Sequence, residues 1–489
     1  MKPFPVIIIA VLLYACCSKE EAKITVTSEV INAAFTGIGV EWDPYDEAAD
    51  WGNDLSNEDW DKLYRRLDFM RPRFVRCMIN SPYKYYNSTT GEYDRDKNIR
   101  GLKKLLQYCQ DNNITVMYGE YNPPTWDMKA DQRWVDMSVD YLSYLVSDLG
   151  FSCIKYFVIF NEPDGNWAST NGDYDLWKQM LFRFREKMNS YPGLTEKVKF
   201  AGPDVVADYR NNASQYDTEG WLKQTAADVD ELTGVYDIHA YPGQHEVRYG
   251  NYNDLLNRYK AAVPANKKII FGEAGFKYWR PADSLLMKEY LRRCENHPFT
   301  KGSDCNMLVY DYFYGLDMAM FCTLIMNAGY TGVAAWMLDD AMHSCGDSGK
   351  PEDIKLWGMW NILGSKVFND PSQEEPRPWY YAWSLMCRYF PDGSNILQLA
   401  IENGKGIFAS AAEKNGKYTL AIININDEDK HYHIELPQTL SGATVYEYSE
   451  SQIPKTESVL KPIKNGVTIG KNGNITVKAN SILLYTNME

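Results

Sequence analysis

A strand followed by a helix recurs eight times between residues 35 and 390 of this 489-residue chain. Short runs of β-branched and aromatic residues alternate with segments whose apolar residues recur at i, i+3, i+4 and i+7, the spacing of one helix face. Eight such units predict an α/β fold of the (β/α)8 (TIM) barrel type, in which parallel strands close into a cylinder inside a ring of helices. The predicted strands span 35–40, 74–79, 114–118, 155–160, 198–201, 235–238, 268–271 and 332–336.

An open, doubly wound sheet is the alternative fold for alternating strands and helices. Such a sheet would carry a glycine-rich nucleotide turn after an early strand, and the sequence has none at that position. The barrel is therefore the favoured architecture.

The pattern of the chain changes after Ser394. Short alternating strands follow, separated by turns such as Asn415-Gly416 and Asn472-Gly473, which predicts a C-terminal antiparallel β-sandwich over 391–489. Residues 23–28 alternate in the same way but precede the first barrel strand. We expect this N-terminal strand to join the sandwich, so that 16–34 form a linker and strand and 35–390 form the barrel.

The N-terminus has the layout of a secretory leader. Met1-Lys2 is followed by an apolar run over 6–13, which is too short to span a bilayer permanently. The stretch from Leu13 to Cys16 resembles a bacterial lipobox, which implies removal of residues 1–15 and lipidation of Cys16, and the charged residues 18–21 resemble a surface-export signal. The sequence thus predicts a lipoprotein anchored in a Gram-negative outer membrane, at the cell surface or on the periplasmic face. Cleavage before the next cysteine and an uncleaved anchor are the alternatives.

The net charge and the cysteine spacing limit the kinds of molecule that the protein is expected to bind. A formal net charge of −14 argues against nucleic acid, whereas 36 Tyr and 14 Trp offer flat rings that can cover the apolar faces of sugars or simply fill the core. The cysteines show no zinc-like spacing, so we expect no metal and no cofactor, and we expect a monomer. Cys294 and Cys305 flank a polar segment and could pair in an oxidising compartment. Inert core thiols are expected at Cys77, Cys109, Cys153, Cys322 and Cys387.

Polar residues stand at the predicted carboxyl ends of the barrel strands, where the active sites of such barrels form. Two of them, Glu162 and Glu273, follow strands four and seven and would face each other across the barrel mouth. That is the arrangement needed to attack a glycosidic bond on one side and to protonate its leaving oxygen on the other. The other candidates are Glu41, Trp42, Arg76, Glu120, Asn161, Asp204, His239, Tyr241, Trp336, Asp339 and Asp340.

The strand ends resemble those of glycoside hydrolase clan A. The resemblance rests on Asn161-Glu162-Pro163, Gly272-Glu273, Arg76, His239-x-Tyr241 and Trp336, and it covers the whole barrel. It implies retaining hydrolysis of a β-linked poly- or oligosaccharide, with Glu162 as general acid/base and Glu273 as nucleophile. The family stays open: Asn161-Glu-Pro-Asp164 is similar to family 39, while Pro123-Pro-Thr-Trp126 and a sandwich built from both chain ends resemble family 30, and family 5 members can also carry such a sandwich.

The resemblance also implies roles around the two glutamates. Arg76 and Tyr241 would keep Glu273 ionised, and burial beside Glu273 would raise the pKa of Glu162. The carboxyl groups would lie about 5–5.5 Å apart, the retaining separation. Asn161 would bind the sugar 2-hydroxyl and Trp336 would form the floor of the subsite. Further substrate contacts are expected from His239, Trp42 and Glu120.

Other interpretations of these residues remain. A non-catalytic glycan-binding surface lipoprotein could keep the same barrel as a capture surface, and a metal-dependent hydrolase would need a His/Asp cluster at the strand ends. Asp339, Asp340 and Asp347 lack the spacing of a calcium loop, so we expect them to face solvent.

Overall fold

The computed structural model describes residues 22–297, 305–343, 354–455 and 459–488. The predicted leader, Cys16 and Asp347 lie outside these ranges. Among the helices of the described ranges, none combines the length and the apolar character that crossing a membrane requires.

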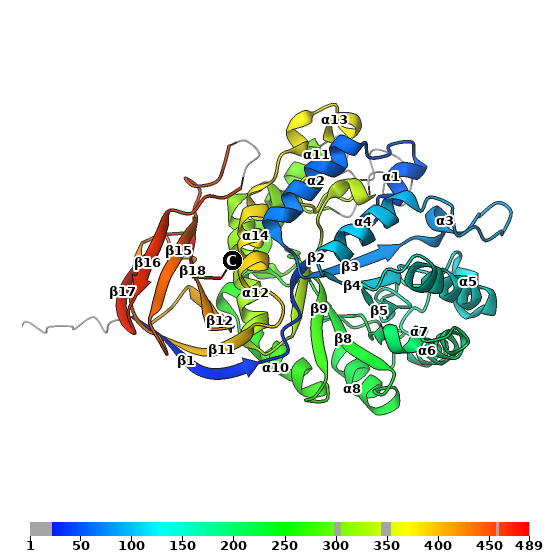
Figure 1. Ribbon diagram of the computed structural model, residues 1–489, viewed down its shortest axis with the longest axis horizontal. Coiled ribbons are helices and arrows are strands. Elements are labelled where there is room, and N and C mark those ends of the chain that lie inside the picture. The colour runs from blue at the N-terminus through cyan, green and yellow to red at the C-terminus, as the bar shows by residue number, and fades with distance from the viewer. Residues whose placement is uncertain (1–21, 298–304, 344–353, 456–458, 489) are drawn as a thin grey trace, which may run out of the picture.

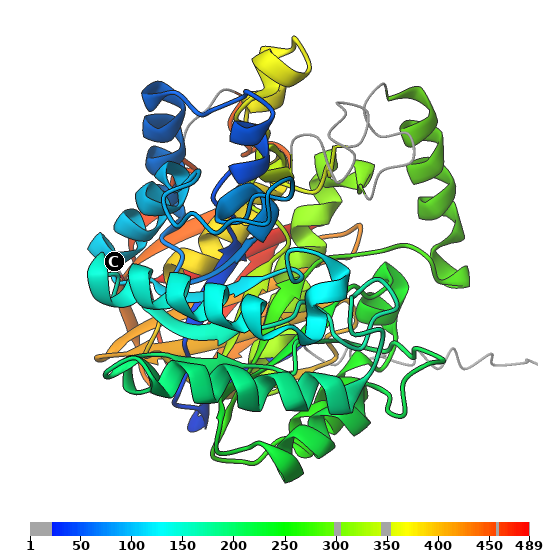
Figure 2. The same ribbon diagram turned by 90° about the vertical axis from the view of Figure 1, so that its right-hand side faces the viewer.

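Eight parallel strands form a closed barrel, as predicted (Figures 1 and 2). The sheet runs from β6 through β5, β4, β3, β2, β10 and β9 to β8, and β8 pairs back with β6 to close the cylinder. The fifth strand is interrupted at residues 202–204 and resumes as β7 (Val205–Val206), which also pairs with β8. The other bounds are β2 (Gly37–Glu41), β3 (Phe74–Ile79), β4 (Thr115–Glu120), β5 (Ile154–Val158), β6 (Lys199–Ala201), β8 (Thr233–Ala240), β9 (Lys268–Ala274) and β10 (Gly332–Ala335).

Amphipathic helices surround the barrel and turn their apolar faces toward it. The capping box of Ser56 and Asp59 begins α2, where Asp59 N donates to Ser56 Oγ at 3.2 Å and Ser56 N donates to Asp59 Oδ2 at 2.8 Å. The main helices are α2 (Asn57–Met70), α4 (Arg100–Asp111), α5 (Gln132–Ser143), α6 (Tyr174–Asn189), α8 (Thr218–Asp228), α10 (Tyr252–Ala262), α11 (Ser284–Asn296), α12 (Tyr312–Asn327) and α14 (Pro378–Tyr389). Shorter helices in the loops include α1 (Asp46–Asp50), α3 (Ser81–Lys84), α9 (Gln244–Tyr249) and α13 (Gly364–Val367).

The C-terminal strands form a second sheet that lies beside the barrel, at the left of Figure 1. Its order is β16-β15-β18-β13-β12-β11-β1-β14-β17. The N-terminal strand β1 (Lys23–Asn32) pairs antiparallel with β11 and parallel with β14, so the prediction that it joins the sandwich is confirmed. The other strands are β11 (Asn395–Glu402), β12 (Ile407–Lys414), β13 (Lys417–Asn424), β14 (Lys430–Glu435), β15 (Leu440–Tyr448), β16 (Lys464–Ile469), β17 (Asn472–Val477) and β18 (Ser481–Thr486).

The second sheet has its own apolar core and also packs on the barrel. Ile24, Ile422 and Ile434 lie in a cluster separate from the barrel core. On the barrel side, Tyr312 of α12 stacks on Tyr448 of β15 with ring centroids 4.7 Å apart. Because α12 is covered by strands on both sides, it is apolar around almost its whole circumference.

Most cysteines behave as expected. Five are buried free thiols: Cys77, Cys109, Cys153, Cys322 and Cys387. The Sγ atoms of Cys294 on α11 and Cys305 lie 3.5 Å apart, so the two side chains are neighbours, and their pairing in an oxidising compartment stays a prediction.

Candidate active site

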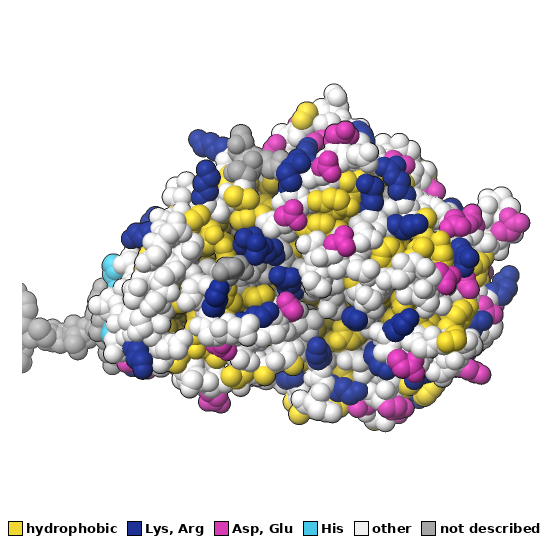
Figure 3. All heavy atoms as spheres, in the orientation of Figure 1, with side chains coloured by type: hydrophobic (Ala, Val, Ile, Leu, Met, Phe, Trp, Pro, Cys, Tyr) yellow, Lys and Arg dark blue, Asp and Glu magenta, His cyan; other side chains and the backbone are white. Residues whose placement is uncertain are grey.

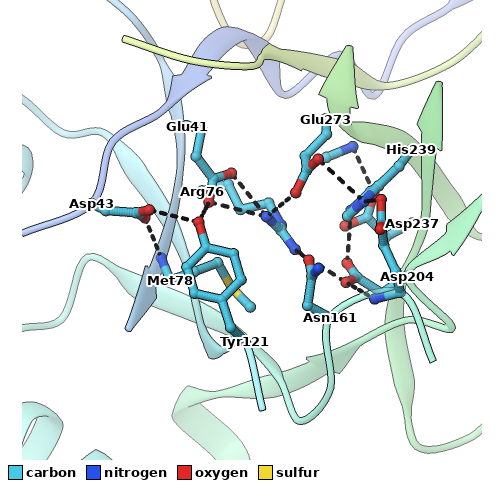
Figure 4. Close-up of polar contacts among 12 residues, drawn as sticks. Glu41, Asp43, Arg76, Met78, Tyr121, Asn161, Asp204, Asp237, His239 and Glu273 are labelled. Carbon is cyan, nitrogen blue, oxygen red and sulfur yellow. Dashed lines mark hydrogen bonds and ion pairs between the residues drawn. The ribbon is translucent and has the colours of Figure 1, made fainter. Parts of the chain in front are cut away.

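Several of the predicted site residues converge at the carboxyl ends of the barrel strands, and Figure 4 shows Arg76, Asn161, His239 and Glu273 among them. Arg76 comes from β3, His239 from β8 and Glu273 from β9, while Asn161 and Glu162 follow β5. These strands are neighbours or near neighbours in a closed barrel, so their ends face one space.

Arg76 is the fully buried centre of this group. Its Nη1 donates to Glu41 Oε2 at 2.9 Å and to Glu273 Oε1 at 2.7 Å. Its Nη2 donates to Asn161 Oδ1 at 2.6 Å and to Asp204 Oδ2 at 3.1 Å. Burial alone would lower the pKa of the guanidinium, but the carboxylates outweigh it and raise that pKa well above its usual value.

Glu162 stands on a turn with unusual backbone geometry. Its φ is +45°, in the left-handed region that non-glycine residues rarely adopt, and Pro163 follows. The backbone N–H of Glu162 donates to Asp204 Oδ2 at 3.3 Å, which ties the turn to the break in the fifth strand. The Glu162 side chain keeps 12% of its surface exposed. Strained backbone held in this way is common where a side chain must be aimed at a substrate.

Both oxygens of Glu162 have partners. Oε1 lies 2.9 Å from His239 Nδ1, and Oε2 accepts a hydrogen bond from Trp167 Nε1 at 2.5 Å. The other ring nitrogen of His239, Nε2, lies 3.2 Å from Asp204 Oδ1. His239 is therefore held between two carboxylates.

Glu273 is likewise bound through both oxygens. Oε1 accepts from Arg76, and Oε2 accepts from the Tyr241 hydroxyl at 2.5 Å. One oxygen of Glu273, one oxygen of Glu162 and one nitrogen of His239 all lie within 4.8 Å of one another. Two carboxylates and one imidazole thus share a single small volume.

The pKa values of Glu162, His239 and Glu273 depend on the charges of their neighbours. Burial disfavours an imidazolium, but Glu273 and Asp204 raise the pKa of His239 well above its usual value. Burial would raise the pKa of Glu162, yet the hydrogen bond and charge of His239 outweigh it and lower that pKa. The pKa of Glu273 is raised, chiefly by burial, against the opposing charges of His239 and Arg76. The direction for Glu162 is contrary to the expected raised pKa, and together the two shifts favour a proton on His239 over one on Glu162.

Two groups in the site could each offer three ligand atoms to a metal ion. They are Glu162, His239 and Glu273, and Asp204, Asp237 and His239. Both groups share His239, so metal binding would first require loss of the imidazolium proton.

Two predicted substrate contacts, Trp42 and Glu120, lie on the wrong side of the barrel wall. Trp42 is fully buried and packs edge-to-face on Tyr108 of α4 with ring centroids 5.8 Å apart. Glu120 accepts hydrogen bonds from Trp134 Nε1 at 3.0 Å and from the Tyr85 hydroxyl at 2.8 Å. Successive residues of a strand point to opposite faces, so each is one position out of phase with the barrel interior. Both predictions are therefore wrong.

The neighbours of these two residues point inward instead. Glu41 binds Arg76, and the Tyr121 hydroxyl donates to Asp43 Oδ2 at 2.7 Å. Glu41 was among the strand-end candidates of the sequence, whereas Tyr121 was not. Strand alternation was the signal that could have identified Tyr121, had the phase of the strand been known.

A second polar cluster adjoins the first through Tyr121. His343 Nε2 lies 3.1 Å from Asp43 Oδ2, and His343 Nδ1 lies 3.0 Å from Glu47 Oε1. Burial opposes the charge, but Glu47 and Asp43 raise the pKa of His343 to about 9. Trp336 follows β10 at the barrel mouth, is almost completely buried, and stacks on His343 with ring centroids 5.7 Å apart. Sequence analysis did not identify this histidine or its two acids.

Asp339 and Asp340 do not face solvent, contrary to expectation. Both are fully buried. Asp340 pairs with Arg377 and accepts from the backbone N–H of Trp357 at 2.8 Å, while Asp339 accepts from Trp360 Nε1 at 2.8 Å. They anchor the loop after β10, where backbone donors would otherwise be buried without partners.

Comparison with known proteins finds no matching family model and no matching curated protein. Solved structures do match. A conserved exported protein from Bacteroides fragilis is 12% identical with a TM-score of 0.63, over 95% of this chain and 100% of that one. The catalytic domain of GH30 xylanase C from Talaromyces cellulolyticus is 12% identical with a TM-score of 0.61, over 96% and 100%. A monomeric β-xylosidase from Caulobacter crescentus is 11% identical with a TM-score of 0.60, over 95% and 98%.

At such low sequence identity these matches are evidence for the fold alone. They include enzymes of glycoside hydrolase families 30 and 39 and extend over nearly the whole chain, barrel and sandwich together. The chain therefore has the (β/α)8 barrel and β-sandwich fold of these clan A glycoside hydrolases.

Proposed function

We propose that the protein is a retaining glycoside hydrolase that cleaves an O-glycosidic bond of a β-linked poly- or oligosaccharide. The observation that carries the proposal is the convergence of Glu162 and Glu273, with oxygens within 4.8 Å of each other. An inverting enzyme keeps its carboxyl groups about 6.5–9.5 Å apart to admit a water molecule. The closer spacing supports double displacement instead.

Glu273 is the nucleophile. Arg76 and the Tyr241 hydroxyl fix its two oxygens, and the positive charge of Arg76 favours the carboxylate over the acid. In the first step a Glu273 oxygen forms a bond to the anomeric carbon while the bond from that carbon to the leaving oxygen breaks. The leaving oxygen takes a proton from Glu162.

His239 supplies that proton to Glu162. The imidazolium holds it at Nδ1, 2.9 Å from Glu162 Oε1, so a short transfer converts Glu162 into the acid form. Formation of the glycosyl ester removes the charge of Glu273. Glu162, now a carboxylate, then takes a proton from water while the water oxygen attacks the anomeric carbon and releases Glu273. That proton passes from Glu162 back to His239 Nδ1, which restores the starting state.

Two neighbouring residues complete the sugar site. Asn161 is held by Arg76, which leaves its amide nitrogen to donate to the sugar 2-hydroxyl. Trp336 lies beside His343 at the end of β10 and forms the floor under the sugar ring. Because structural neighbours are named as xylanases and xylosidases, β-xylosides are the first substrates to test.

The proposal extends to the place where the enzyme works. The lipobox-like stretch ending at Cys16 supports a lipid anchor in the outer membrane of a Gram-negative cell, with the barrel exposed to glycans. Acidic and basic side chains are interspersed on the face shown in Figure 3, in keeping with a neutral carbohydrate partner.

Chemical rescue tests the assignment of Glu162. With a 4-nitrophenyl β-xyloside, Glu162→Ala should release nitrophenol in a burst and then hydrolyse the glycosyl ester slowly. Azide should accelerate the slow phase and give a β-glycosyl azide, the retained configuration. An α-glycosyl azide would contradict the retaining mechanism.

A glycan-binding lipoprotein without activity is the competing proposal. Such a protein would bind xylan or cello-oligosaccharides and release no reducing sugar from any of a panel of polysaccharides and aryl glycosides. That outcome would overturn the hydrolase assignment.

A further inference from the structure

Exposed aromatic rings gather next to Glu162. The oxygen of Glu162 that does not face His239 accepts from Trp167 Nε1 at 2.5 Å. Trp167 nevertheless keeps 44% of its surface exposed. A tryptophan usually satisfies its N–H while burying its ring, so an indole that is tied to a reactive carboxylate but left open is unusual.

The turn that carries Trp167 is built to hold the indole in this place. A Cβ atom added at Gly165 would lie 2.4 Å from Trp167 Cε2, so only glycine leaves room for the ring to fold back over its own turn. Tyr209, from the loop after β7, packs against the indole with ring centroids 4.8 Å apart. The ring is therefore fixed on two sides and open on another.

A third loop brings another exposed indole to the same side. Trp279, in the loop after β9, keeps 67% of its surface exposed. The next residue, Arg280, pairs with Asp208, the neighbour of Tyr209, which joins the loops after β7 and β9. Lys277 Nζ lies 4.8 Å from the Trp279 ring centre and 4.7 Å from that of Tyr241. The loop thus runs from the ring beside the nucleophile outward to Trp279.

We infer that Trp167, Tyr209 and Trp279 form a platform that binds the leaving-group sugar of a neutral oligosaccharide, and that Trp167 also positions Glu162. The inference rests on the proposed function: the acid/base must reach the glycosidic oxygen, so a ring bonded to it lies beside the sugar that departs. Aromatic faces suit the C–H face of a pyranose ring, which is apolar. A substrate that uses this platform therefore carries at least one sugar on the leaving-group side of the cleaved bond.

Substitutions at Trp167 separate the two roles. Trp167→Phe keeps an aromatic face but removes the N–H, whereas Trp167→Ala removes both. Phe182, with 47% of its surface exposed, is the matched control. Phe182→Ala also removes an exposed ring, but from the middle of the helix α6 and not from a loop at the strand ends. Thermal unfolding of each variant verifies the fold.

The probes are xylohexaose and cellohexaose, which have sugar leaving groups, and the β-xylosyl and β-glucosyl fluorides. Fluoride has no ring to stack and departs with little acid assistance. Trp167→Ala should lower kcat/KM for the two oligosaccharides by about tenfold or more, and its kcat/KM for the two fluorides should stay within about twofold of the wild type. Phe182→Ala should keep kcat/KM within about twofold of the wild type for all four probes. Trp167→Phe should keep KM near that of the wild type and lower kcat. Its alkaline limit of activity should move to higher pH, because the lost hydrogen bond favoured the Glu162 carboxylate.

The outcomes distinguish this inference from the proposed function. Equal losses on oligosaccharides and fluorides, or no loss on oligosaccharides, would overturn the platform and leave the hydrolase intact. If the wild type hydrolyses none of the four probes, calorimetric titration with the two hexasaccharides replaces kinetics. If Trp167→Ala binds the hexasaccharides more weakly than the wild type, the platform stands while the hydrolase fails. If the wild type does not bind them, or if the variant binds as tightly as the wild type, the platform is overturned.

Discussion

Two of the buried arginines in the barrel domain, Arg76 and Arg377, differ in what surrounds them. Arg76 meets three carboxylates, those of Glu41, Asp204 and Glu273. Arg377 pairs with Asp340, and its guanidinium also donates to the Gly358 carbonyl and the Tyr310 hydroxyl. Both guanidinium groups are almost wholly removed from solvent.

The difference distinguishes a structural ion pair, at Arg377, from the surroundings expected of a reactive site, at Arg76. Among the described residues, Arg377 forms an ion pair with Asp340, and the backbone N–H groups of Trp357 and Gly358 donate to the same carboxylate. Around Arg76 the carboxylates outnumber the cation, so protons must be shared and pKa values move far from their usual range. Buried surplus charge is unfavourable for folding and persists where a reaction uses it.

Removing Glu273, the proposed nucleophile, should give the largest effect and the sharpest contrast between the two arginine sites. Glu273→Ala is expected to reduce hydrolysis of a 4-nitrophenyl β-xyloside roughly 10⁴-fold or more, because the covalent step loses its attacking group. The melting temperature should change little, since the variant also relieves crowding of negative charge around Arg76. Glu120→Gln is the control: it alters an equally buried carboxylate on the outer face of the barrel and should retain activity. Wild-type hydrolysis by Glu273→Ala would refute the assignment.

Breaking the second arginine site should affect folding rather than rate. Arg377→Met leaves Asp340 buried without its cation, and we expect the free energy of unfolding in urea to fall by about 3–5 kcal/mol. The kcat of the folded variant should stay within severalfold of the wild type. Adding Asp340→Asn should restore part of the lost stability, because the orphaned charge is gone. A large loss of kcat without a loss of stability would erase the distinction between the two sites.

His343 should give a smaller effect that depends on pH. Its pKa is about 9 in the folded protein and about 6.5 when unfolded, so its charge stabilises the fold fully below pH 6.5. That contribution, roughly 3 kcal/mol, should disappear as the pH rises through 9. His343→Gln should therefore show a flatter dependence of unfolding free energy on pH than the wild type. Parallel curves for the two proteins would show that Asp43 and Glu47 do not hold a charged His343.

The sequence predicted the barrel well and its inner surface only in part. Each strand is a buried apolar run, and parallel strands covered on both faces carry a strong signal of this kind. Which of two adjacent residues points inward depends on strand phase, and that choice failed for Trp42 against Glu41 and for Glu120 against Tyr121.

Clusters assembled from distant segments were the other gap. His343 meets Asp43 and Glu47 across almost 300 residues, and nothing local in the sequence marks any of the three as a partner. The sequence alone predicted a solvent-facing Asp340, because its partner Arg377 is brought beside it only by the fold. The proposed catalytic pair, Glu162 and Glu273, could be located from the sequence because each glutamate follows a recognisable strand, and the strand end fixes its place at the barrel mouth.

The N-terminal strand has a consequence for how the protein is made. Thr25 of β1 reaches Glu435 of β14, 410 residues later in the chain. A chain that emerges from the ribosome N-terminus first must therefore keep this strand without its partners until almost the whole polypeptide has appeared. The barrel can form meanwhile, whereas docking of the strand waits for the last hundred residues. Completion of the sandwich would thus be a late, slow event, and exposed unpaired edges would make that interval the most vulnerable to aggregation.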